Sequence, residues 1–268
     1  MPYAERTAAM KTSEWEKRVQ RAARLGERLA CAQEVLAFYG EVLKLQQRIF
    51  NEISAEPVTE SDAPIVQRLR AVDAARHLPA LLALAEQRGP ARLAEEARAI
   101  RGESAEQQNA MLHGFLEDDS EHAFFARALL QPYAERLTSA LPPQPFQGDS
   151  FVCRLCGSRP QAAVLRPEGD GGKRFLLCSL CLTEWEFRRI LCPICGEENH
   201  RHLPRYSAEE VDAVRVEACD TCHFYLKAVD MTVDGLAVPL VDEVATVPLD
   251  LWASEHGYKK VVANLMGF

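Results

Sequence analysis

The cysteines of this chain are concentrated in its second half, where eight of the nine form four Cys-x-x-Cys pairs. The pairs are Cys153 with Cys156, Cys178 with Cys181, Cys192 with Cys195, and Cys219 with Cys222. A Cys-x-x-Cys turn directs two sulfur atoms toward one point, and two such turns supply the four thiolates of a tetrahedral metal site. The residue types and their repeated spacing therefore predict two four-cysteine metal centres.

The order of the pairs suggests how they combine. The gaps between successive pairs are long, short and long, as expected for two modules that each open with one pair and close with the next. Consecutive pairing assigns to the first centre Cys153, Cys156, Cys178 and Cys181, and to the second Cys192, Cys195, Cys219 and Cys222. The alternative is an interleaved arrangement, in which the first pair joins the third and the second joins the fourth.

The spacing leaves the identity of the ion open, because thiolate-rich tetrahedral sites suit both zinc and iron. His200, His202 and His223 lie close to the pairs in sequence, but eight cysteines already complete two centres. Dithiol redox chemistry is a rival use of Cys-x-x-Cys, and it requires a pair at a helix N-terminus beside a βαβ unit. The sequence around the four pairs shows no such pattern, which favours metal binding.

The segments around the cysteines predict tight turns and short strands that would position the sulfur atoms. Gly157 and Gly196 follow the opening pairs, where a tight turn often needs a positive φ. Gly169–Gly172 indicates a hairpin turn before a strand at Lys173–Cys178. Alternating apolar residues over 214–218 predict another strand just before the last pair.

The first half of the chain is expected to be helical. Between Leu29 and Ile53 the apolar residues recur at the i, i+3, i+4, i+7 spacing of one buried helical stripe. Ala, Leu, Glu, Gln and Arg, all good helix formers, dominate this half. We expect five to seven helices packed as an irregular bundle, and none of their residues has catalytic spacing.

Prolines and one cysteine give further expectations for this half. Pro64, Pro90 and Pro132 are expected in first turns of helices, where no backbone N–H is needed. The Pro-rich stretch Leu141–Pro145 is expected to be a linker between the helical half and the cysteine modules. Cys31 is interpreted as a small buried hydrophobic residue rather than a reactive thiol.

Charge and hydropathy narrow the class of protein. The formal net charge is −8, which argues against nonspecific nucleic-acid binding. Arg188–Arg189 and Arg201–Arg205 are the local basic clusters of the cysteine-rich half, and a solvated face is the simplest interpretation of both. No apolar run approaches the roughly 20 residues that a membrane helix needs, and no secretion signal is evident at the start. We therefore expect a cytoplasmic protein without membrane insertion.

Two blocks of the sequence resemble the FdhE family of formate dehydrogenase accessory proteins. They are FLLCSLCLTEWEFRRILCPICG from Phe175 and EACDTCHFYLK from Glu217. The opening CRLCGSRP at Cys153 also fits, as does, more loosely, ERLACAQEVLAFYGEVLKLQQ from Glu27. The resemblance covers nearly the whole chain, and its specificity lies in CSLCLTEW and CDTCHFYLK, which generic zinc ribbons lack.

The resemblance implies a multidomain α+β fold. An all-α helical N-terminal domain would be followed by two small metal-binding β subdomains, rubredoxin-like or zinc-ribbon-like. The expected boundaries are 1–147 for the helical domain, 148–190 for the first four-cysteine subdomain, and 191–268 for the second subdomain with a C-terminal tail.

The resemblance also implies a function. The family's members are cytoplasmic accessory proteins, not enzymes, that contact the catalytic subunit of respiratory formate dehydrogenase and support its maturation or activation before export. That subunit carries a molybdenum or tungsten pterin cofactor. The family's ligands map onto the eight paired cysteines, and its association with rubredoxin-type iron favours iron, with zinc possible. The alternative is a rubredoxin-like iron protein with redox activity, by electron transfer or through thiols, on the same client.

Residues just after the closing pairs are candidates for contact with this client. They are Thr183, Glu184, Trp185, Arg188, Tyr225 and Lys227. Trp185 could equally belong to the core, and Glu184 could form a surface ion pair with Arg188. The rubredoxin knuckle Cys-Pro-x-Cys-Gly is matched fully at 192–196, whereas Leu182 and His223 stand at the glycine position of the closing pairs.

Overall fold

The chain is described by a computed structural model that covers residues 3–56, 63–117, 122–141, 149–169 and 171–268. It divides into two compact units, which are described separately below. The first unit comprises Met1–Val19 and Ala37–Pro142, and the second comprises Gln20–Leu36 and Pro143–Phe268. Most of the expected linker and the expected boundary at residue 147 fall within 142–148, outside the described residues.

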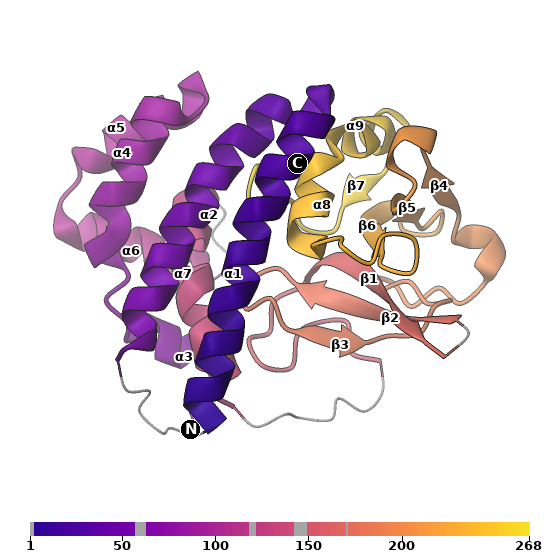
Figure 1. Ribbon diagram of the computed structural model, residues 1–268, viewed down its shortest axis with the longest axis horizontal. Helices are drawn as coiled ribbons and strands as arrows, with labels where there is room; N and C mark the ends of the chain where they lie inside the picture. The colour runs from indigo at the N-terminus through magenta and orange to yellow at the C-terminus, as the bar shows by residue number, and fades with distance from the viewer. Residues whose placement is uncertain (1–2, 57–62, 118–121, 142–148, 170) are drawn as a thin grey trace. The chain divides into compact units, whose positions relative to one another are not determined.

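The first unit consists of helices (Figure 1). The helices α1 and α2 continue into the second unit, and the remainder belong to the first unit alone. The bounds are α1 Tyr3–Arg28, α2 Gln33–Ser54, α3 Ile65–Arg70, α4 Leu78–Arg88, α5 Ala91–Arg101, α6 Ala105–Phe115 and α7 Ala123–Ser139, with short 3-10 helices at Ala30–Ala32 and Ala75–His77. These elements agree with the predicted irregular bundle.

The apolar stripe predicted along the long helix is buried. Val42, Leu43, Ile49 and Phe50 are each at most 1% exposed, and Ile53 is also buried. Burial of each such side chain contributes roughly 1.5–3 kcal/mol relative to leaving it in water. By contrast, the expectation for Cys31 is wrong, because this residue lies exposed at the 3-10 helix between α1 and α2.

Pro132 also differs from expectation, because it lies inside α7 rather than in its first turn. A proline inside a helix lacks the N–H that would bond the carbonyl four residues earlier, here that of Ala128. The side chain of Gln46 supplies the missing donor, since its Nε2 lies 2.9 Å from the Ala128 oxygen. A polar side chain from α2 thus satisfies the carbonyl that makes a mid-helix proline costly.

The second unit is built on one mixed sheet with the order β3-β2-β1-β6-β5-β4, to which β7 adds beside β6. The strands are β1 Pro160–Glu168, β2 Gly171–Cys178, β3 Glu184–Glu186, β4 Arg205–Ser207, β5 Val214–Ala218, β6 Phe224–Asp230 and β7 Lys259–Lys260; the helices are α8 Pro239–Ala245 and α9 Val247–Glu255, with 3-10 turns at His200–His202 and Glu209–Val211. The chain therefore has an N-terminal helical region and a C-terminal sheet region, as predicted. Among the described residues, no helix is both long and apolar enough to cross a membrane.

The strand order reveals an internal duplication. The strands β1, β2 and β3 form one antiparallel meander, and β4, β5 and β6 form another. The two meanders join through β1 and β6, which run parallel from the pair Ala162 and Lys227 to the pair Leu165 and Asp230. The two cysteine modules anticipated from the sequence thus correspond to two copies of one meander that share a single sheet.

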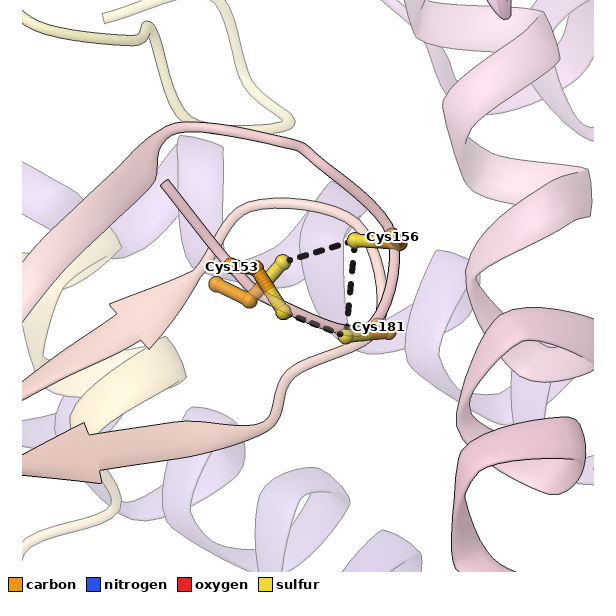
Figure 2. A group of neighbouring side chains, drawn as sticks. Cys153, Cys156 and Cys181 are labelled. Atoms are coloured by element: carbon orange, nitrogen blue, oxygen red, sulfur yellow. Dashed lines mark hydrogen bonds between the residues drawn. The ribbon is translucent and has the colours of Figure 1, made fainter. Parts of the chain in front are cut away.

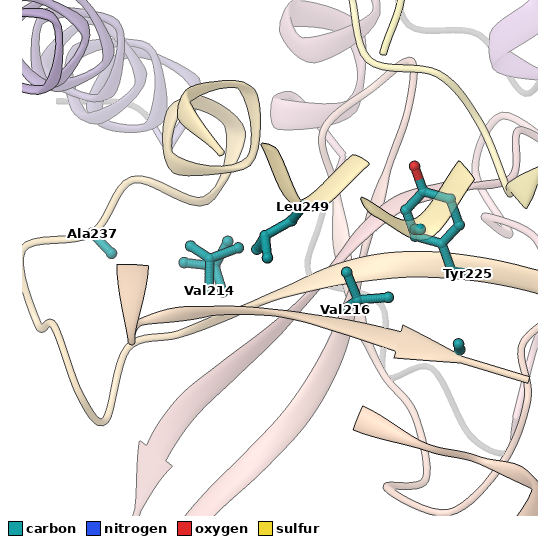
Figure 3. Close-up of a cluster of buried hydrophobic side chains, with 8 residues drawn as sticks. Val214, Val216, Tyr225, Ala237 and Leu249 are labelled. Atoms are coloured by element: carbon teal, nitrogen blue, oxygen red, sulfur yellow. The ribbon is translucent and has the colours of Figure 1, made fainter. Parts of the chain in front are cut away.

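A buried apolar cluster holds the second meander against the C-terminal helices. Figure 3 shows Val214 and Val216 of β5, Tyr225 of β6 and Leu249 of α9 within this cluster. The side chains alternate along β5, so that every second residue from Val214 to Ala218 is buried. This is the period-2 pattern of a strand with one face on a core.

Candidate metal centres

The four Cys-x-x-Cys pairs form four turns of the same design. In each turn the backbone N–H of the first cysteine donates to the carbonyl of the residue five positions later, at 2.9 to 3.0 Å. The residue four positions after the first cysteine has a positive φ in every turn: Gly157, Leu182, Gly196 and His223. The opening turns therefore use glycine, as predicted, while the closing turns place side-chain-bearing residues in a conformation that favours glycine.

The first cluster brings the cysteines of the two turns of the first meander together (Figure 2). The sulfur of Cys156 lies 3.3 Å from that of Cys178 and 3.6 Å from that of Cys181. The sulfur of Cys153 lies 3.6 Å from that of Cys181. All four residues are buried.

The second cluster repeats this geometry in the second meander. The sulfur of Cys192 lies 3.7 Å from that of Cys222, and the sulfur of Cys195 lies 3.6 Å from that of Cys219. Glu197 links the two turns, because its Oε2 accepts a hydrogen bond from the Thr221 hydroxyl at 2.6 Å. The structure thus brings together consecutive pairs rather than interleaved ones.

Both clusters fit a tetrahedral metal ion. A tetrahedron with metal–sulfur distances of about 2.3 Å has sulfur–sulfur edges of roughly 3.8 Å. The sulfur–sulfur separations of 3.3 to 3.7 Å are close to this value, and within each group all four sulfur atoms lie within 4.8 Å of one another. The clusters could therefore hold one ion each, and the donor set suits zinc and iron alike.

The electrostatics of the first cluster also call for a cation. Hydrogen bonding from the neighbouring thiols, first that of Cys153, lowers the pKa of Cys156. Burial, reinforced by the neighbouring cysteines, raises the pKa of Cys178 well above its ordinary value. The four sulfurs cannot all ionise side by side without a positive charge among them, and a bound divalent cation deprotonates coordinating thiols outright.

The two clusters differ in their access to solvent. Every cysteine of the first cluster is buried, whereas in the second cluster Cys195 is exposed and Cys222 is partly exposed. Burial raises the pKa of Cys192 to about 11. The pKa of the more exposed Cys195 is lowered: its slight burial would raise this pKa, but a hydrogen bond from the Glu197 backbone N–H lowers it. The first cluster is enclosed by protein, and the second lies at the surface of its unit.

The histidines near the pairs take no part in either group. Neither four-cysteine group found among the described residues includes His200, His202 or His223. The Nδ1 atom of His202 instead lies 3.2 Å from the Glu197 carboxylate. His223 serves as the positive-φ residue of the last turn.

The residues predicted to contact a client lie at very different depths. Trp185 is buried and its Nε1 donates to the Ser150 carbonyl at 2.9 Å. Arg188 is exposed and pairs with Asp149 at 2.5 Å and Glu198 at 2.9 Å. Thr183 and Glu184 are half-buried. The anticipated pair of Glu184 with Arg188 does not form, because Arg166 takes Glu184 instead, with Nε 2.6 Å from its carboxylate.

Tyr225 and Lys227 face the C-terminal helices rather than solvent. They lie two residues apart on β6 and so share one face of the sheet. The Tyr225 hydroxyl donates to Asp250 at 2.9 Å, and Lys227, which is 0% exposed, pairs with Asp250 at 2.5 Å. Lys227 is therefore closed off from a partner that docks on the surface of this unit.

A buried charge network between β6 and the helices α8 and α9 was not predicted from the sequence. Lys227 and Lys260 both pair with Glu243 of α8 and with Asp250 of α9. Two cations and two carboxylates thus compensate one another in the interior. Nothing in the spacing of these residues signals the network, because its members are distant in sequence and meet only when the helices pack on the sheet.

The comparisons with known proteins agree with this architecture. Residues 152–189 match the domain family described as FdhE, central domain, and residues 190–266 match FdhE, C-terminal domain. A "Protein FdhE homolog" from Aquifex aeolicus is 28% identical over 260 residues, which is 91% of this chain and 92% of that protein. A homologue of the same name from Pseudomonas putida is 33% identical, over 68% of this chain and 60% of its own length.

A solved structure is similar over nearly the whole chain. The crystal structure of the FdhE protein from Pseudomonas aeruginosa superposes with a TM-score of 0.76 at 26% sequence identity. The match covers 95% of this chain and 96% of the crystallised one. The likeness therefore includes the helical region as well as the two cysteine modules.

Proposed function

This chain belongs to the FdhE family, and from that membership and its two four-cysteine clusters we propose that it is an accessory protein for formate dehydrogenase. In this proposal it binds the catalytic subunit in the cytoplasm and supports the maturation or activation of that subunit before export. It does so as a binding protein rather than as an enzyme.

The observation that carries the proposal is the duplicated metal module. Two equivalent meanders each close on four cysteines, and small β modules of this kind bury too little apolar surface to be stable alone. A bound ion links the two turns of a module through four metal–thiolate bonds and so stabilises it. Within each turn, the repeated backbone hydrogen bond fixes the conformation of the two cysteines.

We propose that the client contacts lie at the exposed end of the first module. Arg188 is exposed, and Thr183 and Glu184 retain part of their surface. Arg188 is held by Asp149, which precedes the first opening turn, and by Glu198, which follows the second opening turn. We propose that a client binds this region and that Trp185 supports it from the interior. Tyr225 and Lys227 would act indirectly, by holding the C-terminal helices on the sheet.

Capture of the client tests the proposal. The immobilised full chain is incubated anaerobically with a formate dehydrogenase catalytic subunit, as wild type, Cys178→Ala and Cys31→Ala. Cys178 is a buried member of the first cluster, and Cys31 is an exposed cysteine outside both clusters. We expect wild type and Cys31→Ala to retain the subunit and Cys178→Ala to lose it. Retention by no variant, or equal retention by all three, would contradict the proposal.

The exposure of the second cluster favours a second candidate function, redox activity on the same client. Cys195 is exposed, so an electron donor or acceptor could approach this cluster more closely than the first. Ferric tetrathiolate absorbs visible light and zinc does not. A coloured protein with a reversible potential in the physiological range would favour this candidate, and a colourless zinc protein that still supports its client would remove it.

A further inference from the structure

The two basic clusters noted in the sequence meet beside the second cysteine cluster. Arg189 follows β3, and Arg205 begins β4, yet Arg205 Nη2 lies 3.3 Å from the Arg189 carbonyl oxygen. Both residues line an open hollow at the surface. Arg174 of β2 lines it as well, together with Cys192 and Cys219.

Arg174 is fixed in the wall of this hollow by partners on other elements. It is 3% exposed, and its Nε donates to Glu217 of β5 at 3.0 Å. Its Nη1 donates to the Arg188 carbonyl at 3.0 Å. Glu217 also lies 3.2 Å from Arg215 Nη2, so that this carboxylate is held between two arginines. This carboxylate pairs closely with Arg174, at 2.9 Å, and only at 3.9 Å with Arg205, while Arg189 makes no ion pair among the described residues.

The two remaining guanidinium groups have donors to spare. Arg189 and Arg205 are exposed, and a guanidinium carries five N–H donors in a planar fork. Among the residues that the structure describes, Arg189 uses only Nη1, toward the Gly172 carbonyl, and Arg205 uses only Nη2 in a hydrogen bond. Donors of this kind match the two oxygens of a carboxylate or phosphate.

The surroundings of the hollow select among anions. Apolar side chains form much of its wall, including Leu191, Leu203 and Val261. A divalent ion held by four thiolates leaves a formal charge of about −2 at the cluster on the same wall, which opposes the approach of a dianion. A single negative charge attached to an apolar group is therefore favoured over a dianion.

We propose that this hollow is a binding site for a carboxylate, either free or carried by an acidic side chain with an apolar neighbour on a partner protein. The site is defined by Arg189 and Arg205, with Arg174 and Glu217 as its fixed support. It does not depend on the identity of the client, so it stands or fails separately from the proposed accessory function.

Peptide binding tests the site on the metal-loaded full chain. A peptide with one glutamate between two leucines, labelled with a neutral fluorophore, is titrated at low ionic strength and followed by anisotropy, beside the same peptide with glutamine. We expect the glutamate peptide to bind at least tenfold more tightly. The double variant Arg189→Gln with Arg205→Gln should remove that preference. Arg201→Gln, a control at an exposed arginine of the same module that does not line the hollow, should change it less than twofold.

Acetate distinguishes the two sources of the carboxylate. Its binding is measured as a rise in melting temperature over chloride at equal ionic strength, and phosphate is measured in parallel. Stabilisation by acetate that the double variant loses assigns the site to free carboxylates, and a peptide preference without it assigns the site to an acidic segment. The proposal is overturned if neither acetate nor the glutamate peptide shows an effect that depends on Arg189 and Arg205. It is also overturned if phosphate binds more tightly than both.

Discussion

Cys195 occupies in the second cluster the position that Cys156 occupies in the first, yet Cys156 is 6% exposed and Cys195 is open to solvent. Both are the second cysteine of an opening turn, and both turns carry the same backbone hydrogen bonds. One duplicated design has therefore produced an enclosed centre and an accessible centre. The second centre is therefore the one that a reagent can reach directly.

Thiol modification should follow this difference. We expect an alkylating reagent to modify Cys31 first, Cys195 next, and the buried Cys153, Cys156, Cys178 and Cys181 last, because the reagent must reach the sulfur before it reacts. Time-resolved mass spectrometry of the digested protein measures the order. Equal rates at Cys156 and Cys195 would show that the exposed position of Cys195 has no chemical consequence.

The positive-φ residues of the closing turns give a matched pair of substitutions. His223 is exposed, so His223→Gly should relieve backbone strain with little loss of packing and stabilise the fold by about 1 kcal/mol. Leu182 has the same backbone conformation but packs in a buried apolar cluster, so Leu182→Gly should be destabilising, by about 2 kcal/mol or more. Melting temperatures of the two variants test the pair. A drop for His223→Gly as large as that for Leu182→Gly would contradict the assignment of strain to these turns.

The limits of prediction from sequence follow from which interactions are local. The cysteine turns, the glycines at 157 and 196 and the apolar stripe of α2 could be predicted because each depends on residues a few positions apart. The pairing of β1 with β6 and the burial of Tyr225 and Lys227 could not be predicted. The sequence of a short strand is similar whether or not a helix packs on it. The position of Pro132 inside α7 could not be predicted for the same reason, because the hydrogen bond to the Ala128 carbonyl comes from Gln46 on another helix.

Glu243 should make the stability of the second unit depend on pH in acid. Burial opposes its ionisation, but Lys227 and Lys260 lower the pKa of Glu243 to about 2, against about 4.3 in an unfolded chain. Its ionised form therefore stabilises the fold above about pH 4, and this contribution is lost as the pH falls toward 2. Glu243→Gln should cost about 3 kcal/mol at neutral pH, because it leaves two buried cations with one carboxylate fewer.

Urea unfolding of wild type and Glu243→Gln between pH 7 and pH 3 measures this effect. The difference between the two free energies of unfolding should be constant near neutrality and shrink below about pH 4. Loss of thiolate-bound metal in acid affects both proteins, so the difference isolates the carboxylate. A gap that stays constant down to pH 3 would contradict the lowered pKa of Glu243.

Gln46 and Pro132 should be coupled in stability. Gln46→Leu leaves the Ala128 carbonyl without its donor, and we expect a loss of about 1–3 kcal/mol. In a Pro132→Ala background the helix regains its own N–H at this position, so the same substitution should cost less. A double-mutant cycle from denaturant unfolding measures the coupling. Equal costs in the two backgrounds would show that the glutamine does not compensate for the proline.

The most direct test of the account is the number of metal ions that the folded chain holds. Native mass spectrometry of anaerobically purified protein should show two ions per chain, and their mass identifies the metal. Cys178→Ala should lose one ion and Cys195→Ala the other, because each belongs to a separate cluster. A folded wild-type chain without metal, or one in which a single substitution removes both ions, would contradict the existence of two independent four-cysteine centres.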